Sequence, residues 1–515
     1  MDFKRSIGPV GLLFAGISSV IGSGWLFGPL YAAQIAGPAA VLSWVLGGIL
    51  MIVIALTFAE LGSAFPVAGG MIQFAHYSHG PLVSFMIGWM VWISSVAVAP
   101  VETIGLIQYA ANYLPGLVKS IGDTHVLTHS GILVAAGVML LMCMLNYYGA
   151  QFFSRSNGVI TALKLIVPIA TVLLLMISDF HPGNFHSTVG NGFAPYGLHG
   201  ILAALPLGGV IYSFIGSNTV LQLAGETKNP QRSIPLALIG SMIFCTVLYA
   251  LLQMAFVGAI TPDAFSSGWN KLHYSGDSGP FVGIMTILGI GWFVMIIYAA
   301  AIISPFGTGF VFTASTARVS YGLSEIGLFP RFLKKLTMKG VPLRSILLNF
   351  CVGMLLFLPF PGWQKLVGFI ISCFIVSYII GPISLIALRK SKPDEHRPFH
   401  LPYANVLALL AFYICNLLIF WTGWHTVSRM MIALAIGFVF FILYCFRQKA
   451  ILQKQWRTSW WIFPYFILLT VISYLGTFGD GMNVISFGMD FVVIGCLTVV
   501  IYYLALMLRD KSEAS

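Results

Sequence analysis

The chain alternates between long apolar stretches and short polar segments. Many of the stretches exceed the roughly 20 residues that an α-helix needs to cross a bilayer, and they are continuously apolar rather than alternating as in a β-barrel. The pattern predicts an all-α polytopic membrane protein with about 14 spans. Charged, Gly and Pro residues bound these spans at 8–35, 38–64, 81–115, 130–148, 157–178, 198–223, 234–260, 281–313, 343–361, 364–388, 402–422, 426–446, 458–477 and 485–508.

Composition excludes a soluble protein. Only 8% of the residues are charged, against about 25% in ordinary soluble proteins, and the mean hydropathy is +0.93. The net charge of +11 does not indicate a nucleic-acid partner, because the cations lie between apolar spans rather than on one folded face. The seven Cys residues all lie inside spans, which favours buried thiols over disulfides.

Charge between the spans sets the predicted topology. An even number of spans puts both termini on one side. With that side cytoplasmic, the cytoplasmic segments carry 21 of the 26 Lys and Arg residues, as the positive-inside rule expects. The first apolar run is too long for a signal peptide, so we interpret it as a span. The remaining cations are Lys119, Lys271, Lys365 and Arg429, in external segments, and Lys164, within a span.

Two spans contain residues that disfavour a continuous helix near their middle. The first has Gly22-Ser23-Gly24, and the sixth has Gly208-Gly209 followed by the small and polar run 213–218. Glycines in membrane helices also serve close helix packing, and that alternative holds for either segment alone. Breaks in the first and sixth spans, however, are equivalent positions of two five-helix repeats of opposite topology, and such pairs mark a transporter's midplane binding site.

Broken helices expose backbone groups that suit an amino acid. Helix N-termini favour a carboxylate, and helix C-termini offer carbonyl oxygens to an ammonium group. We therefore expect Ser23 and Gly24 to hold the carboxylate of a zwitterion. The carbonyl oxygens expected to hold its amino group are those near Ile21, Tyr212, Ser213 and Ile215.

Ionisable residues inside spans are functional hypotheses by default, because they are expensive in lipid. Lys164 lies about eight residues into the fifth span and could lose and regain a proton as its surroundings change, or it could tether helices through carbonyl groups. Glu102, in the third span, could be a proton site, an external gate or the partner of a polar neighbour. Glu60, near the end of the second span, suits an inner-gate or structural role.

The polar segments between spans give two further expectations. His76 and His79 have poor spacing for a metal site and are expected to be loop histidines. The cationic stretch 313–344 mixes basic and apolar residues, which predicts an interfacial helix on the membrane surface.

Several of these motifs together resemble the bacterial amino-acid permeases of the amino acid–polyamine–organocation superfamily, over roughly residues 8 to 450. Within the superfamily the chain is most similar to proton symporters of aspartate, in residues 22–27, in residues 77–80 and in having two extra C-terminal spans. The motifs that carry the resemblance are Ile21-Gly22-Ser23-Gly24, Glu60-Leu61-Gly62-Ser63, Ser213-Phe214-Ile215-Gly216, Gly225-Glu226 and Asn229-Pro230.

The resemblance implies a LeuT-like inverted-repeat core of five plus five helices in residues 1–390, spans 11 and 12 in 391–450, and two further spans with a short tail in 451–515. It implies alternating access at a bacterial inner membrane, with both termini cytoplasmic. Lys164 matches the lysine that proton-coupled relatives carry where sodium-coupled members bind an ion. One position departs from the pattern: Asn218 stands where an arginine–agmatine antiporter has a glutamate.

The sequence thus predicts a proton-coupled permease for acidic amino acids such as aspartate or glutamate, with substrate, protons and lipid as its partners. An amino-acid exchanger and a permease for neutral amino acids stay open. An intramembrane enzyme or a channel is disfavoured, because no zinc-protease motif, phosphate loop, serine triad or ring of like residues is present. No motif indicates a cofactor or a metal, and no feature specifies an oligomeric state.

Overall fold

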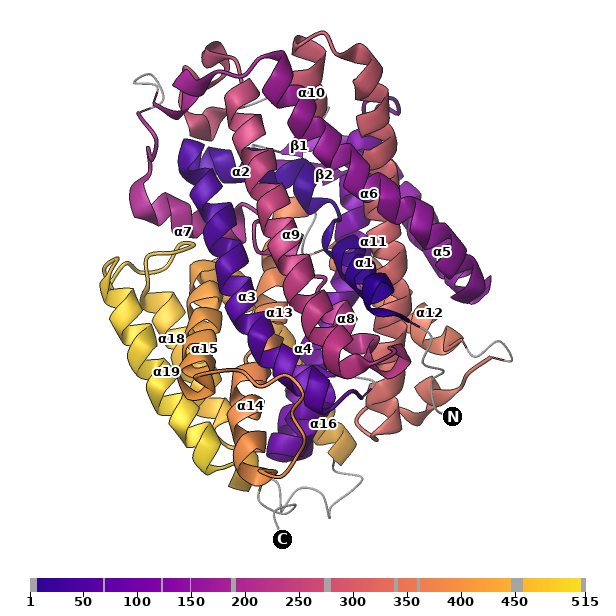
Figure 1. Cartoon of the computed structure of the whole chain (residues 1–515), viewed down its shortest axis with the longest axis vertical. Helices are drawn as coiled ribbons and strands as arrows, with labels where there is room; N and C mark the ends of the chain where they lie inside the picture. Colours follow the sequence, from indigo (N-terminus) through magenta and orange to yellow (C-terminus); the bar gives the residue numbers. More distant parts are fainter. Residues whose placement is uncertain are drawn as a thin grey trace.

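The computed structural model describes residues 7–67, 70–121, 124–148, 150–186, 191–272, 279–337, 341–358, 362–445 and 457–510. These residues form an elongated bundle of long helices (Figure 1). The first half contains α1 (Pro9–Val20), α2 (Gly24–Ala36), α3 (Ala40–Ala64), α4 (Met71–Ala110), β1 (Val118–Ile121), β2 (Thr124–Leu127), α5 (His129–Tyr148), α6 (Ala150–Ser178), α7 (Gly197–Leu207), α8 (Asn218–Gln222) and α9 (Pro230–Ala259). The second half contains α10 (Pro280–Ile287), α11 (Gly291–Glu325), α12 (Leu343–Leu356), α13 (Trp363–Tyr378), α14 (Ile380–Ser391), α15 (Ala404–Trp421), α16 (Trp424–Cys445), α18 (Ile462–Leu475) and α19 (Met489–Met507).

Membrane-length helices dominate this bundle. By length and composition, the described residues contain 11 helices that could cross a membrane, or 12 if the bent pair α7 and α8 counts as one span. Two further apolar helices, α1 and α12, are shorter. Each of the apolar segments delimited in the sequence coincides with at least one helix, so a polytopic helical membrane protein is confirmed, while the count of 14 stays a prediction.

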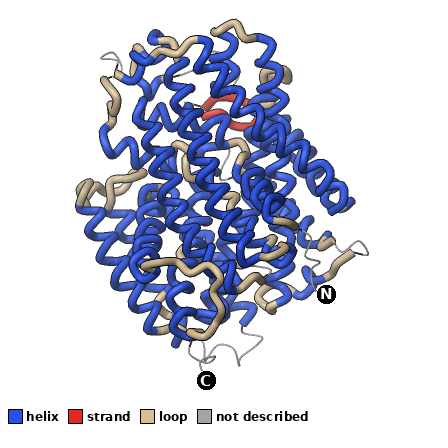
Figure 2. Tube along the Cα trace, in the orientation of Figure 1, coloured by secondary structure: helices blue, strands red, loops and turns tan. Residues whose placement is uncertain are grey.

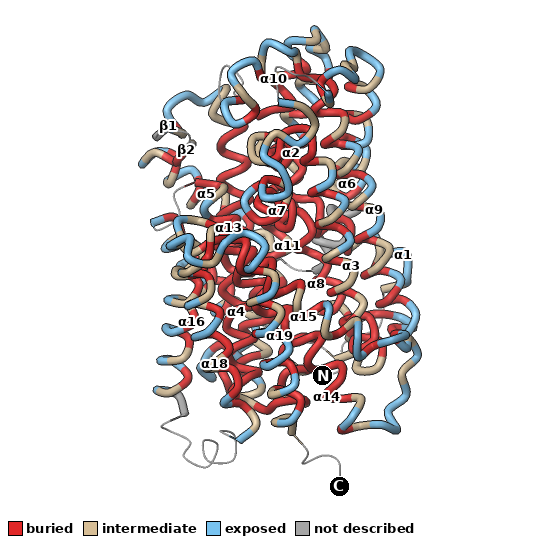
Figure 3. The backbone as a smooth tube through the Cα atoms, turned by 90° about the vertical axis from the view of Figure 1, so that its left-hand side faces the viewer, coloured by how far each residue is buried: buried red, intermediate tan, exposed pale blue. Residues whose placement is uncertain are grey.

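The centre of the bundle is formed by α4 and by α13 with α14. In α4 and in the pair α13 and α14, every residue of the most apolar 18-residue stretch is buried. In α5 and α16, only 28% of the residues in the corresponding stretch are buried (Figure 3). The helix α3 packs along α9, and α4 packs along α11. The outer helices present large apolar side chains such as Leu133 and Ile177 outward, as a lipid-facing surface does.

Three segments differ from the sequence-based expectations. The segment between the third and fourth predicted spans contains an antiparallel hairpin, β1 and β2, which the all-α prediction does not include (Figure 2). The helix α4 begins at Met71, so His76 and His79 lie on a helix, and the prediction of loop histidines is wrong. The separate interfacial helix expected over 313–344 is not formed in the described residues up to Thr337, because α11 continues to Glu325 and is followed there by a short 3₁₀ helix, η7 (Arg331–Lys334).

The C-terminal segment that contains α18 and α19 contacts the start of α4. Gly80 interrupts α4 with φ 77°, a left-handed conformation that favours glycine, and His79 next to it is fully buried. One ring nitrogen of His79, Nε2, hydrogen-bonds the carbonyl of Ala505 in α19 at 3.0 Å. The hydroxyl of Ser459 donates to the His79 carbonyl at 3.1 Å. Two polar contacts therefore fix the C-terminal segment to the kink.

Glu60, at the end of α3, is the centre of a buried charged cluster. Its carboxylate accepts hydrogen bonds from Arg389 Nε at 2.8 Å and from Arg389 Nη2 at 2.5 Å. The backbone N–H of Leu401 donates to it at 2.7 Å, and Arg397 Nε lies 3.5 Å from Oε1. Only 1% of the Glu60 side chain is exposed. The cluster ties α3 to α14 and to the segment that follows α14, which favours the structural role for Glu60.

Replacing Glu60 with glutamine should destabilise the folded protein by about 3–5 kcal/mol, because Arg389 and Arg397 then lose their buried counter-charge. Thermal unfolding of the purified protein in detergent measures this. Glu325→Gln is the matched control, since Glu325 is exposed at the end of α11. Equal unfolding temperatures for the two variants would contradict the assignment.

Candidate transport site

The first predicted break is present and is held open by neighbouring helices. After α1 ends at Val20, Ile21 adopts an extended conformation with φ −82° and ψ 92°, and α2 begins at Gly24. Hydroxyl groups from α11 satisfy the freed carbonyl groups: Thr308 Oγ1 donates to the Ile21 oxygen at 3.2 Å, and Ser304 Oγ lies 3.3 Å from the same oxygen. The surrounding helices therefore stabilise the break, because their side chains replace the lost helical hydrogen bonds.

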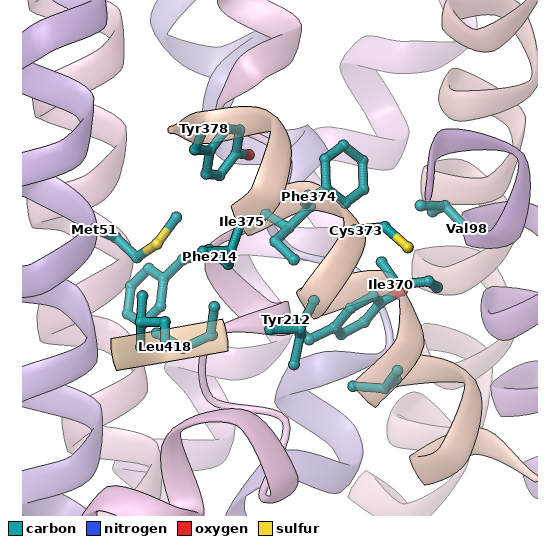
Figure 4. Close-up of a cluster of buried hydrophobic side chains, with 14 of the residues drawn as sticks. Met51, Val98, Tyr212, Phe214, Ile370, Cys373, Phe374, Ile375, Tyr378 and Leu418 are labelled. Carbon is teal, nitrogen blue, oxygen red and sulfur yellow. The ribbon is translucent and has the colours of Figure 1, made fainter. Parts of the chain in front are cut away.

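The second break is longer and lies against the first. The helix α7 ends at Leu207, Gly209 takes a left-handed conformation with φ 75°, a 3₁₀ turn, η3, covers Tyr212–Phe214, and α8 begins at Asn218. The two helices are bent by 49°. Figure 4 shows Tyr212 and Phe214 within a buried apolar cluster beside α13.

The two breaks are in direct contact. Ser19 Oγ in α1 donates to the carbonyl of Gly216 at 3.0 Å, and a Cβ atom added at Gly216 would overlap the Ser19 carbonyl. A Cβ atom at Gly24 would overlap the Ser213 hydroxyl. Glycine is therefore required at both contacts, and Gly24 and Ser213, which were predicted to share a site, are neighbours.

Lys164 is bound to the end of α1. Only 1% of the residue is exposed. Its Nζ donates to the carbonyl oxygen of Ser18 at 2.8 Å and to Thr308 Oγ1 at 2.6 Å. Thr308 in turn donates to the Ile21 carbonyl, so the lysine is connected to the first break through one hydroxyl group.

Glu102 is bound to the start of α2. Its Oε2 accepts a hydrogen bond from the backbone N–H of Ser23 at 2.8 Å, and its Oε1 accepts one from the Tyr212 hydroxyl at 2.6 Å. The carboxylate therefore bridges both breaks, and of the three roles considered for it the pairing with polar neighbours is observed. Within the described residues, Glu102 and Lys164 form no direct ion pair within 4 Å; they lie at the two ends of one interruption.

The carbonyl groups expected to receive an amino group divide into two sets. The Ile21 oxygen accepts the hydroxyl groups of α11, and the Tyr212 oxygen accepts the N–H of Ile215 at 3.0 Å, so both are already used. The oxygens of Ser213 and Ile215 accept no backbone or side-chain hydrogen bond from the residues that the structure describes. These two carbonyl groups have the greatest capacity for an ammonium ligand, because neither of their lone pairs is used.

Three further residues, Ser304, Thr308 and Trp363, belong to the site but are not among those predicted from the sequence. Ser304 and Thr308 are spaced by four residues, so their common helix face could have been read as a polar stripe in an apolar span. Trp363 gives no such signal, yet its Nε1 donates to Ser23 Oγ at 2.9 Å. Its ring packs against Phe27 and Tyr212, with centroids 5.3 and 5.7 Å away, and covers the break.

Interrupted spans that meet inside a helical bundle beside buried ionisable residues are typical of secondary transporters. Comparison with known proteins agrees with this class, because the amino acid permease family matches residues 7–443. The chain belongs to this family of transporters and is not an enzyme.

Curated relatives extend over nearly the whole chain. The glutamate/serine transporter AimA of Bacillus subtilis is 38% identical, covering 99% of this chain and 95% of the relative. The aspartate-proton symporter of the same organism is 35% identical, covering 98% and 96%. The branched-chain amino acid permease BcaP, also from Bacillus subtilis, is 28% identical, covering 86% and 93%. Amino-acid transport by a multi-pass membrane protein is thus the function of the family to which this chain belongs.

Substituting Gly24 with leucine should abolish amino-acid binding, because the side chain cannot fit beside Ser213 without separating the two breaks. A thermal-shift panel of the 20 common amino acids measures binding. Gly137→Leu is the matched control, since no atom lies within 4 Å of a Cβ atom added at Gly137 in α5. Ligand shifts that survive Gly24→Leu would remove the first break from the site.

Proposed function

We propose that this protein is a proton-coupled amino-acid permease that works by alternating access around the two breaks, with acidic amino acids such as aspartate or glutamate as substrates. The observation that carries the proposal is the meeting of two interrupted helices between two buried ionisable residues, Lys164 and Glu102. The functions named for two relatives, a glutamate/serine transporter and an aspartate-proton symporter, support the substrate class and the coupling ion.

In this proposal the binding site lies at the junction of the breaks. The amides of Ser23 and Gly24 begin α2 and carry the partial positive charge of a helix N-terminus, which suits the substrate carboxylate. The amino group binds near the free carbonyl oxygens of Ser213 and Ile215, while Ile21 and Tyr212 shape the site through groups that are already hydrogen-bonded. The Tyr212 hydroxyl acts through Glu102.

The proposed architecture is a LeuT-like core of five plus five helices in residues 1–390, with spans 11 and 12 in 391–450 and two extra C-terminal spans in 451–515. Breaks in the first and sixth apolar segments support the inverted repeat. The even number of apolar segments supports termini on one side of the membrane, which in this proposal is the cytoplasmic side. The cation distribution favours the same orientation in a bacterial plasma membrane.

Proton rather than sodium coupling is supported by the position of Lys164. Its ammonium group occupies the space between the Ser18 carbonyl and the Thr308 hydroxyl, two oxygens that could otherwise ligate a cation. A lysine there repels sodium and supplies a group that can exchange a proton. Lys164 and Glu102 are the pair through which a proton gradient acts on the first break.

Exchange and the transport of neutral amino acids are the second candidates. The serine named for one relative favours a neutral substrate. A dicarboxylate would also need a second positive group, and among the described residues bound to the two breaks Lys164 is the only cation. Uptake of labelled serine, aspartate and glutamate into the same proteoliposomes, with and without internal amino acid, separates these cases.

The decisive experiment on coupling is Lys164→Ala in proteoliposomes with an acidic exterior. Wild type should concentrate labelled substrate, with a rate that rises as the external pH falls, and the variant should lose uphill uptake because the first break loses its buried cation. Lys365→Ala, at the start of α13, is the matched lysine control and should still accumulate substrate. Accumulation by Lys164→Ala would overturn the coupling assignment, and a strict sodium requirement in wild type would overturn the choice of ion.

A further inference from the structure

The backbone group assigned to the substrate carboxylate is already occupied by a carboxylate of the protein. Glu102 Oε2 accepts a hydrogen bond from the Ser23 N–H at 2.8 Å, a charge-assisted hydrogen bond of good geometry. Its other oxygen, Oε1, accepts a hydrogen bond from the Tyr212 hydroxyl at 2.6 Å. A buried carboxylate with two such donors stands where a ligand carboxylate would bind.

The surrounding glycines adapt the site to this carboxylate. A Cβ atom at Gly22 would overlap Glu102 Oε1, and a Cβ atom at Gly105, one turn further along α4, would lie 3.0 Å from Ser23 Cβ. Small residues on both sides thus let α4 approach the break closely enough for Glu102 to reach the amide. The same closeness leaves no room for a second carboxylate on Ser23 while Glu102 is there.

We propose that Glu102 is an internal competitor for the substrate: it holds the Ser23 amide in the empty carrier and is displaced when the carboxylate of an amino acid binds. This inference rests on the proposed function and assigns roles within the Lys164 and Glu102 pair. Glu102 takes up the proton that accompanies the substrate and competes with the substrate, and the ammonium group of Lys164 supplies positive charge at the other end of the break.

The charge balance around the break explains why the competition requires a proton. In the empty carrier, the Lys164 cation faces one anion, the Glu102 carboxylate. Bringing in a substrate carboxylate would place two anions together in an apolar interior, where their repulsion is strong. An acidic amino acid brings two carboxylates and one ammonium group, so if Glu102 takes up a proton as it leaves Ser23, the loaded carrier has two cations and two anions. With an ionised Glu102 it would have three anions against two cations. The substrate's own ammonium group binds separately, at the carbonyl groups of the second break.

The other ionisable groups that face Glu102 are compatible with this role. Tyr212 is a hydroxyl donor to it, Tyr249 of α9 donates to the Val20 carbonyl nearby, and Lys164 faces it across the break. The residues of α11 and α13 that line the break, Ser304, Thr308 and Trp363, do not titrate near neutral pH. Glu102 is therefore the acidic group whose protonation frees the Ser23 amide.

The test is the pH dependence of substrate affinity for wild type and Glu102→Gln, using labelled L-serine, L-aspartate and L-glutamate as probes. For a transported probe, wild-type affinity should rise up to about tenfold for each unit that the pH falls while Glu102 titrates, because one proton is taken up on binding. Glutamine cannot titrate, so the affinity of the variant should be nearly independent of pH, and the variant should lose accumulation driven by a pH gradient.

Two further measurements keep the inference falsifiable if the glutamine variant folds poorly. Glu102→Asp keeps the charge and should retain the pH dependence. The second measurement compares serine with serinamide, which lacks the carboxylate, in wild type between pH 5 and pH 7, where the proton concentration changes about a hundredfold. The affinity for serinamide should not show the pH dependence of the affinity for serine. A pH dependence that persists in Glu102→Gln, or is equal for serine and serinamide, would overturn the competitor role alone. Absence of amino-acid transport by wild type would instead overturn the proposed function.

Discussion

Unpaired backbone groups inside an apolar bundle must find hydrogen-bond partners, and this constraint organises the centre of the protein. Interrupting α1 and α2 at residues 21–23 releases amide and carbonyl groups that lipid or apolar side chains cannot satisfy. Hydroxyl groups of α11, the ammonium group of Lys164 and the carboxylate of Glu102 bind them. The helices that supply these partners are thereby fixed around the break.

The same contacts place opposite charges at the two ends of one interruption. Lys164 binds the C-terminal end of α1, where the helix dipole is negative, and Glu102 binds the N-terminal end of α2, where it is positive. Each buried charge is therefore stabilised by a helix end rather than by a direct ion pair. Such an arrangement allows one charge to change while the other stays bound, which a direct ion pair would hinder.

The sequence was sufficient for the parts of this structure that depend on local composition. Continuous apolar runs predicted the helices, and Gly22-Ser23-Gly24 together with Gly208-Gly209 predicted both interruptions, because few apolar helices tolerate such residues at their centre. Lys164 and Glu102 could be singled out as ionisable residues in apolar surroundings. The partners of these groups could not be predicted, since Trp363 meets Ser23 across 340 residues of chain. The prediction of a loop at His79 is wrong because Gly80 and Pro81, which usually end a helix, lie at a kink inside α4.

The most direct test of the central claim is an experimental structure of the purified protein at acidic pH with its transported amino acid bound. The amino-acid carboxylate should lie within hydrogen-bond distance of the Ser23 N–H, with its ammonium group near the Ser213 and Ile215 carbonyl oxygens and Glu102 turned away from the amide. An amino acid bound elsewhere in the bundle, or bound while Glu102 still holds Ser23, would contradict it.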